Sequence, residues 1–295
     1  MSNAFKHPEF LLSAEQLTSL QASESWVSVR LFDCTTHLDP AENAVYTVRS
    51  GRAEYDQAHI PGAGFMDLQG ELSDPNTNLR FMLPEPERFA EAVAAHGVSN
   101  ESHVILYSST HVMWATRVWW MFRAFGHDRV SVLDGGLGRW QALGYPTTQS
   151  KPDYPPGDFM ARPRAGHFVD RETVLGAIND GEACVLNALS REQHIGETGR
   201  HYGRPGRIAR SVNVEARSLT DDSGCFLDAP SLRERFEAVD AMGRPVIAYC
   251  GGGIAATADV FALALLGHQD LSVYDASLSE WANHADCPME VGEPV

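Results

Sequence analysis

A cysteine stands where an apolar segment meets a glycine-rich one, in the run Tyr249-Cys250-Gly251-Gly252-Gly253-Ile254-Ala255. Residues 245–249 predict a short buried strand, and we expect a helix to begin near Ala255. Glycines allow a tight loop with converging backbone N–H groups, and a helix start adds positive potential there. Such surroundings favour the nucleophilic thiolate and a bound anion. The pattern predicts a cysteine enzyme for a small anionic substrate, with a buried structural cysteine as the alternative.

The composition narrows the class of protein. A chain of 295 residues, 43% hydrophobic and 21% charged, is typical of two ordinary globular domains. The net charge of −16 argues against nucleic acid and anionic membranes as partners. No apolar run is long enough to span a bilayer, and the start lacks the apolar core of a secretion signal, so we expect a cytoplasmic protein.

The cysteines indicate a reduced protein without a bound metal. There are five of them, an odd number, and no two form a Cys-x-x-Cys pair. This pattern argues against a disulfide framework and against a zinc site. We expect no cofactor.

A basic loop stands out against the acidic background. Four arginines lie within eleven residues: Arg200, Arg204, Arg207 and Arg210. One interpretation is a solvated loop whose arginines pair with surface carboxylates. The other, which we follow, is a loop that captures an anion beside Cys250, with Arg200, Arg204 and Arg207 as its binding residues. A turn at Pro205-Gly206 would point the side chains of Arg204 and Arg207, which flank it, in the same direction.

The chain contains an internal repeat. Two strand-like segments, two helix ends and two following strands match in order: 104–108 with 246–250, 125–127 with 266–268, and 130–134 with 271–275. Such ordered similarity indicates two copies of one domain. Alternating strands and helices predict an α/β fold in which each copy has a mostly parallel sheet covered by helices on both faces. Ligands bind at the carboxyl ends of such strands, where Cys250 falls.

The domain limits follow from this repeat. We assign residues 1–148 to the first domain, 149–166 to a proline-rich linker and 167–295 to the second domain. At the position of Cys250 the first copy has Ser108, followed by a loop without glycine that contains bulky side chains and one base, His111. We therefore predict an inactive first domain and a catalytic second one. The helix containing 117–122 is interpreted as packing, facing the second domain.

Taken together, these features resemble the tandem-domain rhodanese family, the thiosulfate and 3-mercaptopyruvate sulfurtransferases. An inactive first copy and an active second copy are usual in that family. The resemblance covers nearly the whole chain and rests on an ordered set of motifs: His59-Ile-Pro-Gly-Ala63, Met82-Leu-Pro84, Arg117-Val-Trp-Trp120, Phe125-Gly-His127, Leu133-Asp-Gly-Gly136, Ser211-Val-Asn-Val214 and the Cys250 loop.

The resemblance implies a sulfur transfer in two steps. The Cys250 thiolate attacks the outer sulfur of thiosulfate and sulfite leaves; cyanide or a thiol then removes the sulfur from the Cys250 persulfide. Fixed N–H dipoles stabilise the transferred charge, without metal or organic cofactor. The amides expected to hold the persulfide belong to Gly251, Gly252, Gly253, Ile254 and Ala255. We also expect that a side chain at position 252 is incompatible with the loop.

Some residues depart from the family pattern and bear on the sulfur donor. The neutral Cys-Gly-Gly-Gly loop is similar to that of the mercaptopyruvate type. However, Phe81 replaces the histidine that this type has before Met-Leu-Pro, and the loop has no serine for a proton relay. Asn187-Ala188-Leu189 replaces the usual Asp-x-Arg, and Arg207 replaces the histidine of a second His-Ile-Pro-Gly. We predict thiosulfate as the donor, with 3-mercaptopyruvate as the alternative.

Two other functional classes are less well supported. A cysteine phosphatase needs an arginine six positions after the cysteine, and that position is Ala256, with Thr257 one residue later. A non-catalytic sulfur carrier or regulatory module would keep the fold without turnover, and it would not require a complete catalytic loop of cysteine and glycines. Their presence favours an enzyme.

Overall fold

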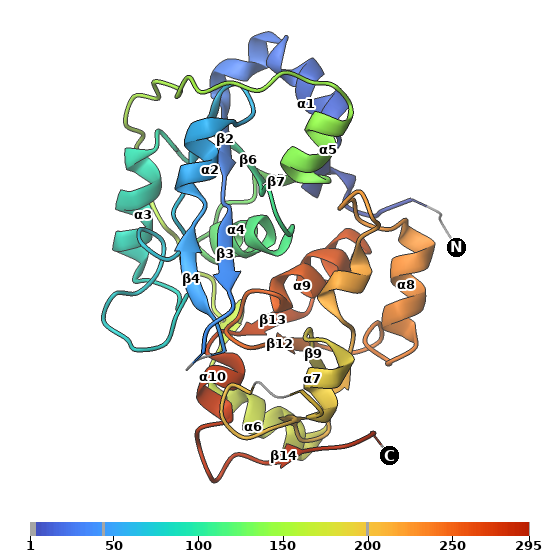
Figure 1. Cartoon of the computed structure of the whole chain (residues 1–295). Helices are drawn as coiled ribbons and strands as arrows, with labels where there is room; N and C mark the ends of the chain where they lie inside the picture. Colours follow the sequence, from blue (N-terminus) through green and yellow to red (C-terminus); the bar gives the residue numbers. More distant parts are fainter. Residues whose placement is uncertain (1–3, 43–44, 199–200, 295) are drawn as a thin grey trace.

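The computed structural model describes residues 4–42, 45–198 and 201–294. It contains two α/β domains, each built on a five-stranded sheet in the described chain, with every neighbouring pair of strands parallel (Figure 1). The first sheet has the order β1 (Leu11–Leu12), β7 (Val130–Leu133), β6 (His103–Tyr107), β2 (Val29–Asp33), β5 (Ala63–Phe65). The second has the order β11 (Val212–Asn213), β9 (Cys184–Asn187), β12 (Val246–Tyr249), β13 (Leu271–Tyr274), β8 (Phe168–Val169). The predicted fold class is confirmed.

Helices cover these sheets. Those of the first domain are α1 (Ala14–Gln21), α2 (Arg52–Gln57), α3 (Pro86–Ala95), α4 (Met113–Ala124) and α5 (Gly136–Ala142), with 3₁₀ turns at η1 (Pro8–Phe10) and η2 (Glu24–Ser28). Those of the second are α6 (Arg171–Asp180), α7 (Arg191–Ile195), α8 (Ala229–Glu237), α9 (Ala256–Leu265) and α10 (Ser277–Trp281), with η3 (Ala216–Leu219). Two antiparallel pairs complete the described elements: β3 (Thr36–Asp39) with β4 (Thr47–Ser50), and β10 (Arg207–Ile208) with β14 (Met289–Glu290).

The central strands of each sheet are buried on both faces, which explains why they are mostly apolar. Along β6, Ile105 and Tyr107 belong to one hydrophobic cluster, whereas Val104 and Leu106 belong to another. This alternation follows from the two-residue period of a strand. The second of these clusters continues into the other domain, so the two domains share one core. No helix in the described ranges has the length and apolar character needed to cross a membrane.

Helices α4 and α9 form the contact between the domains and lie side by side in Figure 1. Trp119 packs edge-on against Phe261, with ring centroids 4.8 Å apart, and the hydroxyls of Thr116 and Thr257 lie 2.9 Å apart. Both helices are apolar around most of their circumference because each is covered by its own sheet and by the other helix. The segment 117–122 therefore faces the second domain, as predicted.

The linker follows the surface of the first domain without forming a helix or a strand between α5 and β8. Phe159 is buried against Phe89, and the backbone amide of Arg162 donates to the carbonyl of Phe125 at 2.8 Å. The linker thus packs against the first domain. We keep 1–148 and 167–295 as the proposed domain limits.

A buried ion pair crosses the domain contact. Arg117 of α4 is 0% exposed, and its Nη1 donates to Asp275 Oδ1 at 2.6 Å and to the Gly253 carbonyl at 3.2 Å. Its Nη2 donates to the Phe81 carbonyl at 2.5 Å. The other oxygen of Asp275 accepts from the amide of Leu83 at 2.7 Å, so both partners are tied to both domains. In the described chain Nε of Arg117 has no partner, and the hydrogen bonds of its two terminal nitrogens and of Asp275 offset the cost of burying the charges.

We expect Arg117→Met to lower the free energy of unfolding by about 3–5 kcal/mol, because it leaves the Asp275 carboxylate buried without its counter-ion. In Arg117→Met/Asp275→Asn the loss should be smaller than the sum of the two single losses, and urea denaturation of all four proteins measures this coupling. The control is Arg191→Met, which removes an exposed arginine that pairs with the exposed Glu293 and should cost less than about 1 kcal/mol. Additive effects of Arg117 and Asp275 would contradict the pairing.

A second ionisable side chain, Asp259, is buried without a hydrogen-bond partner among the described residues. Asp259 of α9 is 0% exposed, and within the described chain neither of its carboxylate oxygens has a hydrogen-bond partner. Burial raises the pKa of this carboxyl well above its usual value, so the folded protein holds it in the neutral form. The unfolded chain ionises near pH 4, and above that pH the group therefore disfavours folding.

We expect Asp259→Ala and Asp259→Asn to be more stable than the wild type at pH 8, by up to about 1–3 kcal/mol for alanine. The gain should shrink as the pH falls towards 4, where the unfolded wild type also becomes protonated. The asparagine variant keeps an unpaired polar group but cannot ionise, so it isolates the pH-dependent part. Urea denaturation at pH 5 and pH 8 measures both effects; a gain independent of pH would show that ionisation plays no part.

Candidate active site

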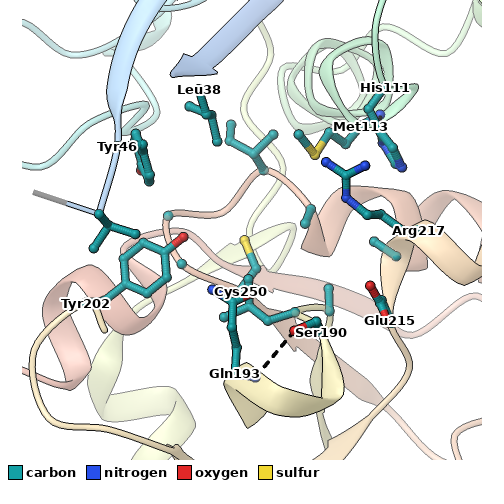
Figure 2. A pocket seen from close by; sticks show the side chains of 18 of the residues that line it. Leu38, Tyr46, His111, Met113, Ser190, Gln193, Tyr202, Glu215, Arg217 and Cys250 are labelled. Atoms are coloured by element: carbon teal, nitrogen blue, oxygen red, sulfur yellow. Dashed lines mark hydrogen bonds between the residues drawn. The ribbon is translucent and has the colours of Figure 1, made fainter. Parts of the chain in front are cut away.

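Cys250 follows β12, the central strand of the second sheet, and the loop after it leads into α9 at Ala256. The predicted order of strand, cysteine, glycine loop and helix is therefore correct. Cys250 is only 2% exposed, and Figure 2 shows its sulfur directed into a cavity. A thiol in this position lies at the carboxyl edge of the parallel sheet, the usual place for a ligand site in such folds.

Ser277, at the start of α10, holds the cysteine loop in place. Its Oγ accepts from the backbone amides of Cys250 and Gly253, at 3.1 Å each, and donates to the Tyr274 carbonyl at 2.8 Å. Ser277 has a φ of 49°, a left-handed conformation that is unfavourable for a residue with a side chain. The matching residue of the first domain, Gly136, has a φ of 51°. A serine in this strained position indicates that its hydroxyl is needed there.

The loop leaves a set of free backbone donors around the thiol. In the described part of the chain, no acceptor is in hydrogen-bond contact with the amides of Gly251, Gly252, Ile254 and Ala255. The amide of Gly253 is occupied by Ser277, so the role predicted for it as a fifth donor is wrong. Such unpaired N–H groups next to a sulfur atom are suited to an anion.

The three glycines differ in what they allow. At Gly251 a Cβ atom would lie 1.9 Å from Cζ of Tyr202, and at Gly253, with φ of 72°, it would lie 2.6 Å from the Asp275 carbonyl oxygen. At Gly252 the nearest atoms would be 3.7 Å away, an ordinary contact, and φ is not positive. The expectation that the loop excludes a side chain at Gly252 is therefore wrong; Gly251 and Gly253 are the restricted positions.

A cavity of about 290 Å³ opens in front of Cys250 and is formed by both domains (Figure 2). Its walls are mostly apolar or aromatic. The residues labelled in Figure 2 comprise Leu38, Tyr46, His111 and Met113 of the first domain, and Ser190, Gln193, Tyr202, Glu215 and Arg217 of the second. This size is at the lower end of the range for small-molecule sites.

Two tyrosines border the cavity beside Cys250. The rings of Tyr46 and Tyr202 meet edge to face with centroids 6.2 Å apart. Burial raises the pKa of Tyr46 to about 12, and burial likewise raises the pKa of Tyr202, with negative charge at Cys250 adding to both. Both hydroxyls therefore stay protonated at neutral pH and are able to donate hydrogen bonds.

The basic loop reaches the cavity with Tyr202, and not with Arg204 or Arg207 as the sequence analysis predicted. The guanidinium of Arg204 donates to the carbonyls of Trp281, Ala282, His284 and Cys287. Arg207 is buried, donates to the Gly292 carbonyl at 2.6 Å and pairs with Glu290 at 3.1 Å. Neither side chain lines the cavity. Their role as anion-binding residues is therefore wrong, because both are used to hold the C-terminal segment. Arg200 lies outside the described residues.

Several residues of the site escaped the sequence analysis. Tyr46 lies in the connection between β3 and β4, and Arg217 lies in η3, where no motif marks them. The sequence does mark Ser277. When the two copies are aligned, it stands at the position of Gly136, the last glycine of Asp134-Gly135-Gly136. Arg117 lies in the segment that we interpreted as packing, and Asp275 ends one of the repeated strands; no local pattern indicates that they pair.

The corresponding site of the first domain has a different structure. Ser108 follows β6, and its Oγ accepts from the Thr110 amide at 3.1 Å. Nδ1 of His111 accepts from the amide of Met113 at 3.1 Å, and in the described chain His111 makes no hydrogen bond to Ser108. Burial lowers the pKa of His111 to about 4, which makes it a weak base. The inactivity of this domain stays a prediction, and these contacts favour it.

Comparison with known proteins places the chain in a family. The model for the rhodanese-like domain matches residues 13–143 and again residues 174–284. Thiosulfate/3-mercaptopyruvate sulfurtransferase 2 of Arabidopsis thaliana is 34% identical over 90% of this chain and 85% of its own. Thiosulfate sulfurtransferase of Rattus norvegicus is 35% identical over 80% of this chain and 82% of its own.

A solved structure agrees with these relatives. SseA from Escherichia coli, a 3-mercaptopyruvate sulfotransferase with the rhodanese fold, superposes with a TM-score of 0.80 over 92% of this chain and 99% of its own, at 30% identity. The relatives thus include both donor types. With two family domains, a shared fold and a cysteine loop at the sheet edge, the chain belongs to the tandem-domain rhodanese family of sulfurtransferases.

Proposed function

We propose that the protein transfers a sulfane sulfur from thiosulfate to cyanide or a thiol through a persulfide on Cys250. The observation that carries this proposal is the set of unpaired amides around the Cys250 sulfur, which suits a terminal sulfur anion. Gly251, Gly252, Ile254 and Ala255 supply these amides.

The first step makes one S–S bond and breaks another. The Cys250 thiolate attacks the outer sulfur of thiosulfate, and sulfite leaves with the electron pair of the broken bond. The product is a Cys250 persulfide anion, whose charge the free amides and the hydroxyls of Tyr46 and Tyr202 stabilise. In the second step cyanide or a thiolate attacks the terminal sulfur, and the Cys250 thiolate leaves. Charge is conserved in both steps, and no oxidant is consumed.

Proton supply distinguishes the two candidate donors. Sulfite leaves as an anion and needs no proton, whereas the carbon of 3-mercaptopyruvate must gain one when its sulfur departs. Phe81 occupies the cavity wall where a relay histidine would serve this purpose, and the tyrosines are weak acids because burial raises the pKa of each. This favours thiosulfate. The loop without cations favours 3-mercaptopyruvate, which remains the second candidate.

Cys250→Ser should abolish sulfite release from thiosulfate, because an alcohol cannot form a persulfide. Intact mass spectrometry should show the wild type gaining one sulfur atom from thiosulfate and losing it to cyanide, with no gain in the variant. Ser108→Ala is the control and should keep nearly full activity. Substantial turnover by Cys250→Ser would sink the proposal, and a large loss in Ser108→Ala would overturn the inactive first domain. Kinetics with thiosulfate and 3-mercaptopyruvate side by side identify the donor.

Ser277→Ala should slow persulfide formation by about tenfold or more, because it removes the acceptor that aligns the Cys250 and Gly253 amides. Ser277→Gly should be equally slow but more stable than Ser277→Ala by about 1 kcal/mol, since glycine adopts the left-handed conformation without strain. Stopped-flow measurement of sulfite release gives the rates and urea denaturation gives the stabilities. Wild-type rates in both variants would mean that the loop holds its shape without Ser277.

A further inference from the structure

The side of the cavity across from Cys250 holds an unpaired cation. Arg217 lines the cavity, and Figure 2 shows its guanidinium extending from η3 towards His111 and Met113 of the first domain. Arg217 is exposed to solvent at this position, and within the described chain it makes no ion pair or hydrogen bond, although the protein carries a net charge of −16. A cation left free in an acidic protein and directed into a cavity is available to an anionic ligand.

His111 adds a neutral donor beside Arg217. Its Nδ1 accepts from the Met113 amide at 3.1 Å, so in the neutral ring the proton is on Nε2. That Nε2 is buried and has no partner among the described residues. Because burial lowers the pKa of His111 to about 4, the ring keeps this tautomer throughout the neutral pH range. A buried N–H without an acceptor is costly unless a ligand supplies one.

The space around these two donors is larger than inorganic ions require. A second hollow of about 290 Å³ adjoins the cavity and shares with it Leu38, His111, Met113 and Arg217. Leu38 and Met113 are apolar, so the path between Cys250 and Arg217 is suited to a carbon chain. Cyanide at the persulfide would leave this space unused. An organic acceptor with sulfur at one end and an anion at the other fits both ends.

We propose that Arg217 and the Nε2–H of His111 bind the carboxylate of an organic thiol that accepts the sulfur from Cys250. This inference rests on the proposed function and concerns only its second step. The thiolate of the acceptor attacks the terminal sulfur of the persulfide, an S–S bond forms, and the bond to Cys250 breaks with its electron pair on the Cys250 thiolate. The product is an organic persulfide with the same total charge.

Glu215 provides a matched variant for the test, because its charge is opposite to that of Arg217. It lies two residues before Arg217 and lines the same cavity, but the two side chains form no ion pair. Its carboxylate repels an anionic acceptor, whereas Arg217 attracts it. Removing the charge of Glu215 should therefore raise kcat/KM for an anionic acceptor, and removing the charge of Arg217 should lower it.

The experiment uses thiosulfate as donor and three acceptors: 3-mercaptopropionate, 2-mercaptoethanol and cyanide. With Arg217→Met we expect kcat/KM for 3-mercaptopropionate to fall about tenfold, while the values for 2-mercaptoethanol and cyanide fall much less. Glu215→Gln should raise kcat/KM for 3-mercaptopropionate. Arg129→Met, which removes an exposed arginine of the first domain that lines neither hollow, controls for net charge. Added salt should weaken the preference of the wild type for the carboxylate.

The outcomes separate this inference from the proposed function. An equal loss for all three acceptors in Arg217→Met would place Arg217 on the donor or the persulfide and overturn the inference. No loss for any acceptor, or the same loss in Arg129→Met, would also overturn it. His111→Phe, which keeps the ring and removes the N–H, should lower the same carboxylate preference. If the wild type releases no sulfite even with cyanide, the proposed function itself fails, independently of Arg217.

Discussion

The ion pair between Arg117 and Asp275 is the constraint on which the site depends. It is fully buried between the domains, and Arg117 uses the same guanidinium to hold the carbonyl of Gly253 in the cysteine loop. Because a buried charge without its partner is very unfavourable, the pair opposes any movement that would separate the domains. The cavity in front of Cys250 exists only while the domains stay together, since both domains supply its walls. The first domain thus supplies part of the cavity wall and, through Arg117, also holds the cysteine loop.

The strained residue Ser277 fixes the shape of the cysteine loop. In the first domain a glycine occupies the left-handed position next to the loop, at no conformational cost. In the second domain Ser277 occupies it, and its hydroxyl fixes two amides so that four others remain free around the sulfur. The same backbone therefore supports a closed, serine-bearing loop in one copy and an open ring of donors in the other. The two arrangements differ in the residue at this position and in the glycines that only the second loop contains.

The chemistry and its selectivity reside in different parts of the site. The free amides belong to one loop of the second domain and are suited to any terminal sulfur anion. The side chains that face them come from distant parts of the chain: Tyr46 and His111 of the first domain, Tyr202 and Arg217 of the second. The selectivity for donor and acceptor that we propose is therefore assigned to the domain contact. Replacing these side chains alters the wall and leaves the loop in place, which explains how one fold serves different donors.

The sequence by itself determined the duplicated α/β fold, the family and the cysteine loop, because these depend on local periodicity and on motifs that lie within single segments. For Arg204 and Arg207 the sequence was misleading, because their spacing suggested an anion site. Their guanidinium groups instead bind carbonyls of a segment about eighty residues away. Only the tertiary structure decided which cation faces the cavity, which two amides donate to Ser277 and how Arg117 reaches Gly253. These are long-range contacts, and the direction of a side chain across a domain contact is not encoded in its neighbours.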